Sequence, residues 1–194
     1  MPPRDWLNDV PPWLPPRRPL VVVALDPADA LESSAGLVRY CCQRGNATLV
    51  IFVTQPGRAR CAEPYDILDN LSGGLARAAQ LDFPAGQLHR CGDALVRVLR
   101  ELTSASVLLV SPVVEGCHSD HYSIGAACRH VARQKCLLSM CYPLGGMRGG
   151  LPGSLELRRV RRFFLNSTMR AAKARAMKQL GRSADRSSWE IFLT

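Results

Sequence analysis

Four apolar runs, separated by segments with helical spacing, constrain the fold of this chain more than any other feature. They are PLVVVAL (19–25), ATLVIFVT (47–54), SVLLVSPVV (106–114) and LLSMCY (137–142). Continuous hydrophobicity, with many β-branched residues in the first three runs, is typical of strands buried on both faces of a sheet. We therefore predict an α/β fold, a Rossmann-like three-layer sandwich with a mainly parallel sheet and right-handed crossovers.

The remaining segments fill out this pattern. Helices are expected over 32–44, 65–81, 93–103, 122–134 and 167–180, and shorter strands over 87–91, 155–165 and 189–193. Gly45 is a stop signal after the first helix, whereas Gly73 and Gly74 weaken the second.

The N-terminus, residues 1–18, is Pro-rich and lacks the continuous apolar region of a secretory signal. We interpret it as an arm that packs through Trp6, Leu7, Trp13 and Leu14, or stays partly mobile. The rest, 19–194, has the length of one domain. No apolar run approaches the ~18 residues that span a bilayer. A cytoplasmic protein without a membrane span is expected.

The eight cysteines should be mostly reduced in a chain without an export signal. None forms a CxxC pair, which argues against a zinc site built from four cysteines. Cys41 and Cys42 lie on an expected helix and are interpreted as small core residues.

The formal net charge is +9, and much of the excess lies near the C-terminus. Such a run can meet nucleic acid or another polyanion. We favour a solvated helix face, because no aromatic residues interleave with the run as a stacking surface requires. Its members are Arg158, Arg159, Arg161, Arg162, Arg170, Lys173, Arg175, Lys178, Arg182 and Arg186.

Two polar segments follow the first and third apolar runs. ALDPAD contains Asp26 and Asp29, and HSDH contains His118, Asp120 and His121. Because the carboxyl ends of parallel strands meet at one edge of the sheet, the two segments should lie close together. Two carboxylates and one imidazole, with open positions for water, are typical of a catalytic metal site.

Each segment alone also has an ordinary interpretation. Asp26 and Asp29 suit an N-cap and a turn residue, and His118 and His121 suit a surface loop. Asp120 suits a helix cap or a residue that orients a histidine. The expected convergence at one sheet edge favours the functional interpretation.

The same segments resemble the LmbE-like, or PIG-L, N-deacetylase family. ALDPADALESSAG aligns without a gap with the family motif around H-P-D-D-E-x-x-x-x-G-G, and HSDHYSIGAA aligns with the later H-P-D-H motif. GNATLVIFVTQPG, MRAAKARAMKQLGRS and WEIF resemble further family segments. The resemblance extends from about residue 19 to the end of the chain.

This resemblance implies a Rossmann-type enzyme that removes N-acetyl groups from N-acetylglucosamine-like sugars. By position it implies that Asp26, Asp29 and His121 hold zinc and that His118 stabilises the tetrahedral oxyanion. The family's general base falls on Ala28.

The chain departs from the family at several positions. Asp26 replaces a ligand histidine, and Ala28 cannot accept a proton. Ala30, Gln55, Asn70 and Gly73 replace further family residues, each charged in the family. A positioned general base contributes about 10²–10⁴-fold to a rate. Glu32 and Asp120 are candidate substitutes, although neither falls on the base position. The altered ligands suit zinc, another divalent metal, or none.

Two hypotheses follow, and a polyanion-binding protein is a weaker third. The first is a divergent metal-dependent N-deacetylase that acts on an N-acetylglucosamine-like or related acylated amine, with His118 and Asp120 as catalytic residues. The second is a catalytically retired relative that serves as a binding or regulatory subunit, with a protein partner or as a homo-oligomer.

Overall fold

The computed structural model describes residues 14, 17–54, 64–113, 119–143, 160–182 and 189–193. Seven strands form one sheet in the order β3-β2-β1-β4-β5-β7-β6. The strands are β1 Leu20–Ala24, β2 Thr48–Thr54, β3 Ala76–Phe83, β4 Leu108–Pro112, β5 Leu138–Tyr142, β6 Val160–Phe164 and β7 Trp189–Leu193. The helices are α1 Pro27–Gln43, α2 Pro64–Ser72, α3 Gly92–Leu102, α4 Ser119–Gln134 and α5 Ser167–Gln179, with a 3₁₀ turn, η1, at Leu88–Arg90.

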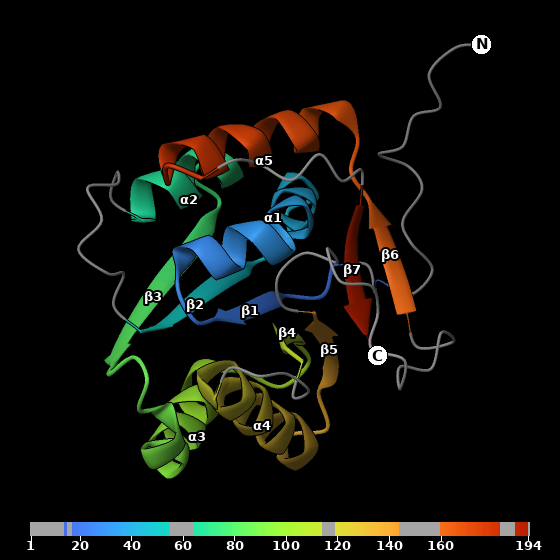
Figure 1. The fold of residues 1–194 in the computed structure, drawn as a ribbon. Helices are drawn as coiled ribbons and strands as arrows, with labels where there is room; N and C mark the ends of the chain where they lie inside the picture. Colours follow the sequence, from blue (N-terminus) through green and yellow to red (C-terminus); the bar gives the residue numbers. More distant parts are fainter. Residues whose placement is uncertain are drawn as a thin grey trace.

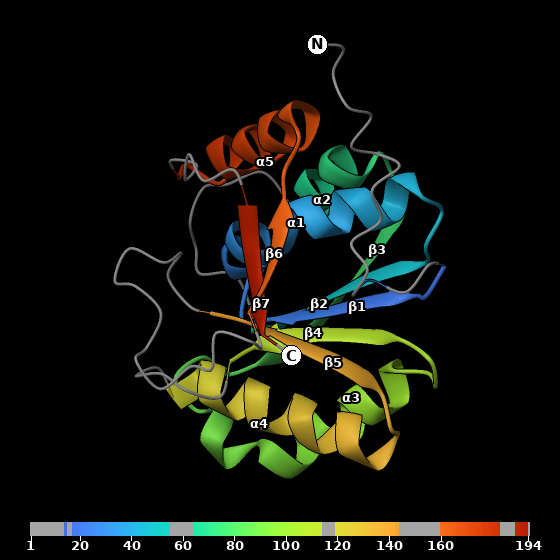
Figure 2. The same cartoon turned by 90° about the vertical axis from the view of Figure 1, so that its right-hand side faces the viewer.

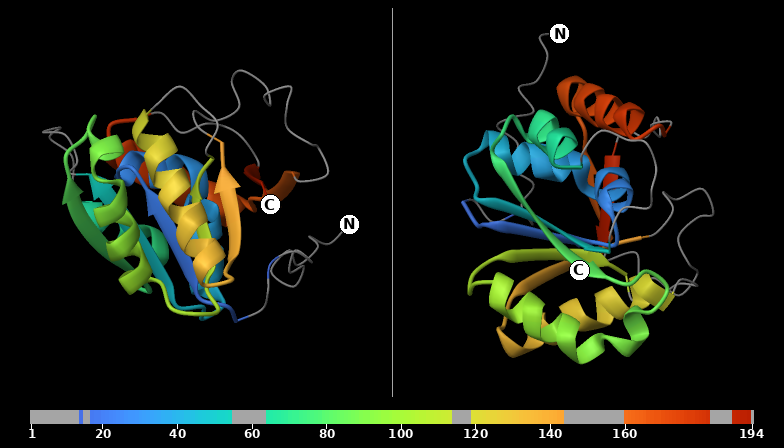
Figure 3. Two further views of the ribbon diagram at one scale, coloured as in Figure 1. Left: turned by 90° about the horizontal axis from the view of Figure 1, so that it is seen from below. Right: turned by 90° about the vertical axis from the view of Figure 1, so that its left-hand side faces the viewer.

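The sheet is mainly parallel. Strands β1 to β5 pair in parallel, and β7 pairs antiparallel with both β5 and β6. Helices α1, α2 and α5 cover one face, and α3 and α4 cover the other (Figures 1 and 2). The view from the opposite side shows the same three layers, and the view from below shows α3 and α4 in front of the sheet (Figure 3). The predicted Rossmann-like sandwich is confirmed.

Strand β1 shows why the first apolar run is continuous. Leu20, Val22 and Ala24 belong to the core under α1, α2 and α5. Val21 and Val23 belong to the core under α3 and α4. All five side chains are buried, because helices cover both faces of a central parallel strand.

Helix α1 begins at Pro27, earlier than the predicted residue 32. Asp26 has an extended backbone and caps the helix, and Pro27 occupies its first turn, where no amide donor is needed. The predicted stop at Gly45 is confirmed, since Gly45 adopts φ 73° directly after the C-cap residue Arg44.

Two predicted elements are wrong. The helix expected over 65–81 ends at Ser72, and β3 begins at Ala76. Gly73 and Gly74 adopt φ 71° and 75°, left-handed conformations that end a helix. The strand expected over 87–91 is instead the 3₁₀ turn η1, whose first residue is anchored by a side chain of α4, as described below.

A buried ion pair joins α1, α5 and β7. Lys173 Nζ lies 3.0 Å from Glu190 Oε1, and the two side chains are 6% and 1% exposed. The Glu190 carboxylate also accepts hydrogen bonds from the amides of Gly36 (2.7 Å) and Leu37 (2.9 Å). Lys173 therefore does not belong to the solvated helix face that the sequence predicted for the basic run.

These contacts fall in the middle of α1. Lys173 Nζ donates to the carbonyl of Glu32 (2.5 Å), the group that the Gly36 amide would meet in a regular helix. Figures 1 and 2 show that α1 changes direction part-way along its length. The ion pair thus supplies partners for backbone groups at this bend.

Of the N-terminal arm, Leu14 lies in the core next to the α1 face of the sheet, whereas Trp6, Leu7 and Trp13 lie outside the described residues. The predicted strand residues 155–159 also lie outside them. Among the helices of the described ranges, none combines the length and apolar character needed to cross a membrane.

Candidate functional site

The two polar segments meet where the strand order reverses. Strands β1 and β4 are parallel neighbours, and the chain leaves them toward opposite faces, to α1 and to α4. Asp29 lies in the first turn of α1, and His121 near the start of α4. Asp29 Oδ2 is 3.4 Å from His121 Nε2, and the side chains are 12% and 13% exposed. The structure therefore brings these two predicted site residues together in a shielded position.

Asp29 has two donors besides this contact. Its Oδ2 accepts hydrogen bonds from the Leu25 amide (2.9 Å) and from the Tyr142 hydroxyl (2.7 Å). Tyr142 is fully buried at the end of β5. Burial, and then the charge of Asp29, raise the pKa of Tyr142 well above its ordinary value. The hydroxyl therefore stays protonated and donates to the carboxylate.

Sequence reasoning treated Tyr142 only as part of a buried strand. Two facts could have indicated its role. Tyr142 lies at the carboxyl end of that strand, where the site was expected, and a buried tyrosine hydroxyl usually has a hydrogen-bond partner.

Asp26 acts as the N-cap of α1. Its Oδ1 accepts a hydrogen bond from the Asp29 amide at 2.9 Å. This is the ordinary role considered for Asp26 from the sequence, and it fixes the first turn that carries Asp29. A role as metal ligand stays a prediction.

Asp120 is buried, and its carboxylate contacts the segment before α3 and not the Asp29–His121 pair. Its carboxylate accepts hydrogen bonds from the amides of Gly86 (2.5 Å) and Leu88 (3.2 Å). These bonds anchor the start of α4, and with it His121, to the segment before α3. The structure gives Asp120 this anchoring role, and its catalytic role stays a prediction. His118 lies outside the described residues.

The spacing of the carboxylate and the imidazole at this edge of the sheet fits two ligands of a metal site. Ligand atoms about 2.0–2.1 Å from a tetrahedral zinc ion lie roughly 3.3–3.4 Å from each other. The 3.4 Å between Asp29 Oδ2 and His121 Nε2 matches this spacing and exceeds the usual hydrogen-bond range. Within the described ranges, no three His, Cys, Asp or Glu side chains gather as a potential metal site. Asp29 and His121 thus form a pair of candidate ligands.

No carboxylate stands at the position that resembles the family's base. Ala28 there is apolar and 9% exposed. Glu32, a candidate substitute, directs its carboxylate toward Arg182, with 3.8 Å between Oε2 and the guanidinium Nη1. Neither residue supplies a base beside the Asp29–His121 pair.

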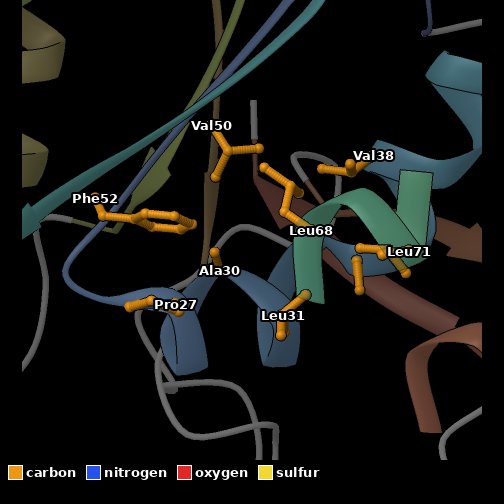
Figure 4. Close-up of a pocket in the computed structure, with 9 residues that line it drawn as sticks. Pro27, Ala30, Leu31, Val38, Val50, Phe52, Leu68 and Leu71 are labelled. Atoms are coloured by element: carbon orange, nitrogen blue, oxygen red, sulfur yellow. The ribbon is translucent and has the colours of Figure 1, made fainter. Parts of the chain in front are cut away.

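A small apolar cavity lies beside the first turns of α1, between α1, α2 and β2 (Figure 4). Pro27, Ala30, Phe52 and Leu68 are among its lining residues. Its volume of about 10 Å³ is close to the minimum that one water molecule needs. We interpret it as a packing gap in the core and not as a substrate pocket.

No family model and no curated protein matches this sequence. Solved structures do share its fold. The A40926 pseudoaglycone deacetylase Dbv21 is 18% identical with a TM-score of 0.66, over 84% of this chain and 81% of that one. The zinc-inhibited form of teicoplanin deacetylase Orf2 is 15% identical with a TM-score of 0.61, over 83% of each chain. GalB, the 4-carboxy-2-hydroxymuconate hydratase from Pseudomonas putida KT2440, is 11% identical with a TM-score of 0.60, over 91% and 94%.

The chain therefore has the fold of deacetylases, and the resemblance to LmbE-like or PIG-L proteins is confirmed at the level of fold. The same fold also carries a hydratase. The fold alone consequently leaves the reaction open, and any functional conclusion depends on the residues of the site.

Proposed function

We propose that this protein is a divergent metal-dependent N-deacetylase that acts on an N-acetylglucosamine-like or related acylated amine. The observation that carries this proposal is the 3.4 Å approach of Asp29 to His121 at the carboxyl edge of β1 and β4. The fold shared with two antibiotic deacetylases supports the choice of an amide hydrolase.

Asp29 and His121 would hold the metal, Asp26 is proposed as a third ligand, and His118 as a donor to the oxyanion. A bound divalent cation would lower the pKa of its water toward about 7 and polarise the amide carbonyl. The zinc-inhibited form of teicoplanin deacetylase makes zinc the first metal to test.

The chain's own residues set the geometry of this site. The Leu25 amide and the Tyr142 hydroxyl donate hydrogen bonds to Asp29, and Asp120 anchors the helix that presents His121. Ala28 supplies no base, so turnover should be about 10²–10⁴-fold below that of an otherwise equal site with one.

Metal content tests this proposal directly. The purified, tag-free protein is dialysed against trace zinc and analysed for bound metal. We expect about one equivalent in the wild type and loss of that metal in His121→Ala. His130→Ala, an exposed histidine on the same helix, is the matched control and should keep the metal. No bound metal in the wild type, or metal retained by His121→Ala, would refute the assignment.

A retired relative that serves as a binding or regulatory subunit is the second candidate. It is favoured by Ala28 at the base position and by the capping role of Asp26. Ala28→Asp distinguishes the two. In a metal-binding hydrolase this change should raise acetate release from N-acetylglucosamine substrates by about one to three orders of magnitude. A protein that binds no metal and gains no activity from Ala28→Asp fits the binding role. A partner protein or a homo-oligomer should then be sought.

A further inference from the structure

Three elements far apart in the sequence converge on one carboxylate. Asp29 comes from α1, His121 from α4 and Tyr142 from the end of β5. The Tyr142 oxygen is 2.7 Å from Asp29 Oδ2 and 3.2 Å from the carbonyl oxygen of Val23. A tyrosine hydroxyl has one proton, and the shorter, charge-assisted contact is the stronger bond. We therefore place that proton on the bond to Asp29.

The backbone of Tyr142 is fixed at the same edge. Tyr142 is paired in register with Pro112, the last residue of β4, and its carbonyl accepts the Val113 amide at 2.9 Å. Its side chain is fully buried. One residue thus contacts both the strand that leads to His121 and the carboxylate that faces His121.

Without this hydroxyl, the Leu25 amide would be the remaining described donor to Asp29. The χ2 torsion of an aspartate is broad, so a single donor on one oxygen holds the carboxylate plane weakly. We propose that Tyr142 is a positioning residue, whose hydroxyl holds the Asp29 carboxylate in the orientation that faces His121. The proposal deepens the proposed metal site and rests on it.

Tyr142→Phe removes only the oxygen. Tyr40→Phe is the matched control, because Tyr40 is also buried but belongs to the other end of α1, where its ring packs against Phe163. The first readout uses metal-free protein: the imidazole chemical shifts of His121 by NMR. We expect Tyr142→Phe to move the His121 signals and Tyr40→Phe to leave them in place. Since the Tyr142 hydroxyl donates to Asp29 and not to His121, a shift of the His121 signals reports a change in the Asp29 carboxylate, and the zinc affinity tests whether its orientation has changed.

The second readout is zinc affinity, measured by competition with a chromophoric chelator. We expect Tyr142→Phe to weaken zinc binding by about 10–100-fold, as for other residues that orient a ligand, and Tyr40→Phe to change it less than threefold. Unchanged His121 signals and unchanged affinity in a folded Tyr142→Phe protein would overturn the positioning role.

A wild type that binds no zinc would refute the proposed function instead. The His121 signals of the metal-free protein would still decide whether Tyr142 positions Asp29, so the two failures are distinguishable. Thermal unfolding of each metal-free variant checks that the protein is folded.

Discussion

Replacing Glu190 by glutamine tests whether the buried ion pair stabilises the bend in α1. The side chain keeps its shape but loses its charge, and one of its two oxygens becomes an NH₂ donor. Lys173 then loses its buried anionic partner, and one of the two amides at Gly36 and Leu37 faces a donor. Breaking a buried pair by removing one partner typically destabilises a protein by about 3–5 kcal/mol. For a chain of 194 residues this corresponds to a decrease in Tm of roughly 6–20 °C.

The free energy of unfolding can be measured by urea denaturation followed by circular dichroism. Glu32→Gln is the matched control, because its carboxylate is 34% exposed and lies 3.8 Å from the exposed Arg182 guanidinium. Exposed pairs contribute about 0–1 kcal/mol, so this control should change stability little. A loss below about 1 kcal/mol in Glu190→Gln would refute the idea that the buried pair stabilises α1.

Three further predictions use the same unfolding assay. Gly36→Ala should destabilise by about 1–3 kcal/mol or more, because a Cβ there would lie 2.0 Å from Leu165 Cδ2, whereas Gly92→Ala meets nothing within 4 Å and should be close to neutral. Asp26→Ala should cost about 0.5–2 kcal/mol through loss of the α1 cap, and Asp26→Ser should recover most of it. Burial raises the pKa of the Cys41 thiol to about 12, so above about pH 9 only the unfolded thiol ionises. Stability should therefore fall between pH 9 and 12, and Cys41→Ala should weaken that dependence.

Strands β1, β2 and β4, which the sequence predicted correctly, have a nearly uniform buried environment, whereas β5 was predicted as buried but exposes Ser139. A central parallel strand such as β1 is apolar on both faces, so its pattern needs no knowledge of its neighbours. Strand β3, ARAAQLDF, contains several good helix formers and lies at the edge of the sheet. Pairing with β2 makes it a strand, and that is a tertiary effect that local propensity does not contain.

The polar contacts likewise include one that the sequence predicted and others that it did not. The approach of Asp29 to His121 follows from the rule that carboxyl ends of parallel strands meet, and it was predictable. The partners of Asp29, Asp120 and Glu190 were not, because each depends on which backbone amide or side chain the folded chain places within 3 Å or so of a carboxylate. Buried polar groups need such partners, but the sequence does not say where they come from.

The shared fold excludes fewer reactions than the residues of the site do. Deacetylases and a hydratase both adopt it, and both reactions add the elements of water to an unsaturated carbon. What such a site must supply is an activated water molecule. In this chain Ala28 supplies no base and Glu32 points toward Arg182, and we propose a metal held by Asp29 and His121 as the means of activation. Metal binding is consequently the property on which the hydrolase and the retired relative differ most, and it should be measured before any substrate is screened.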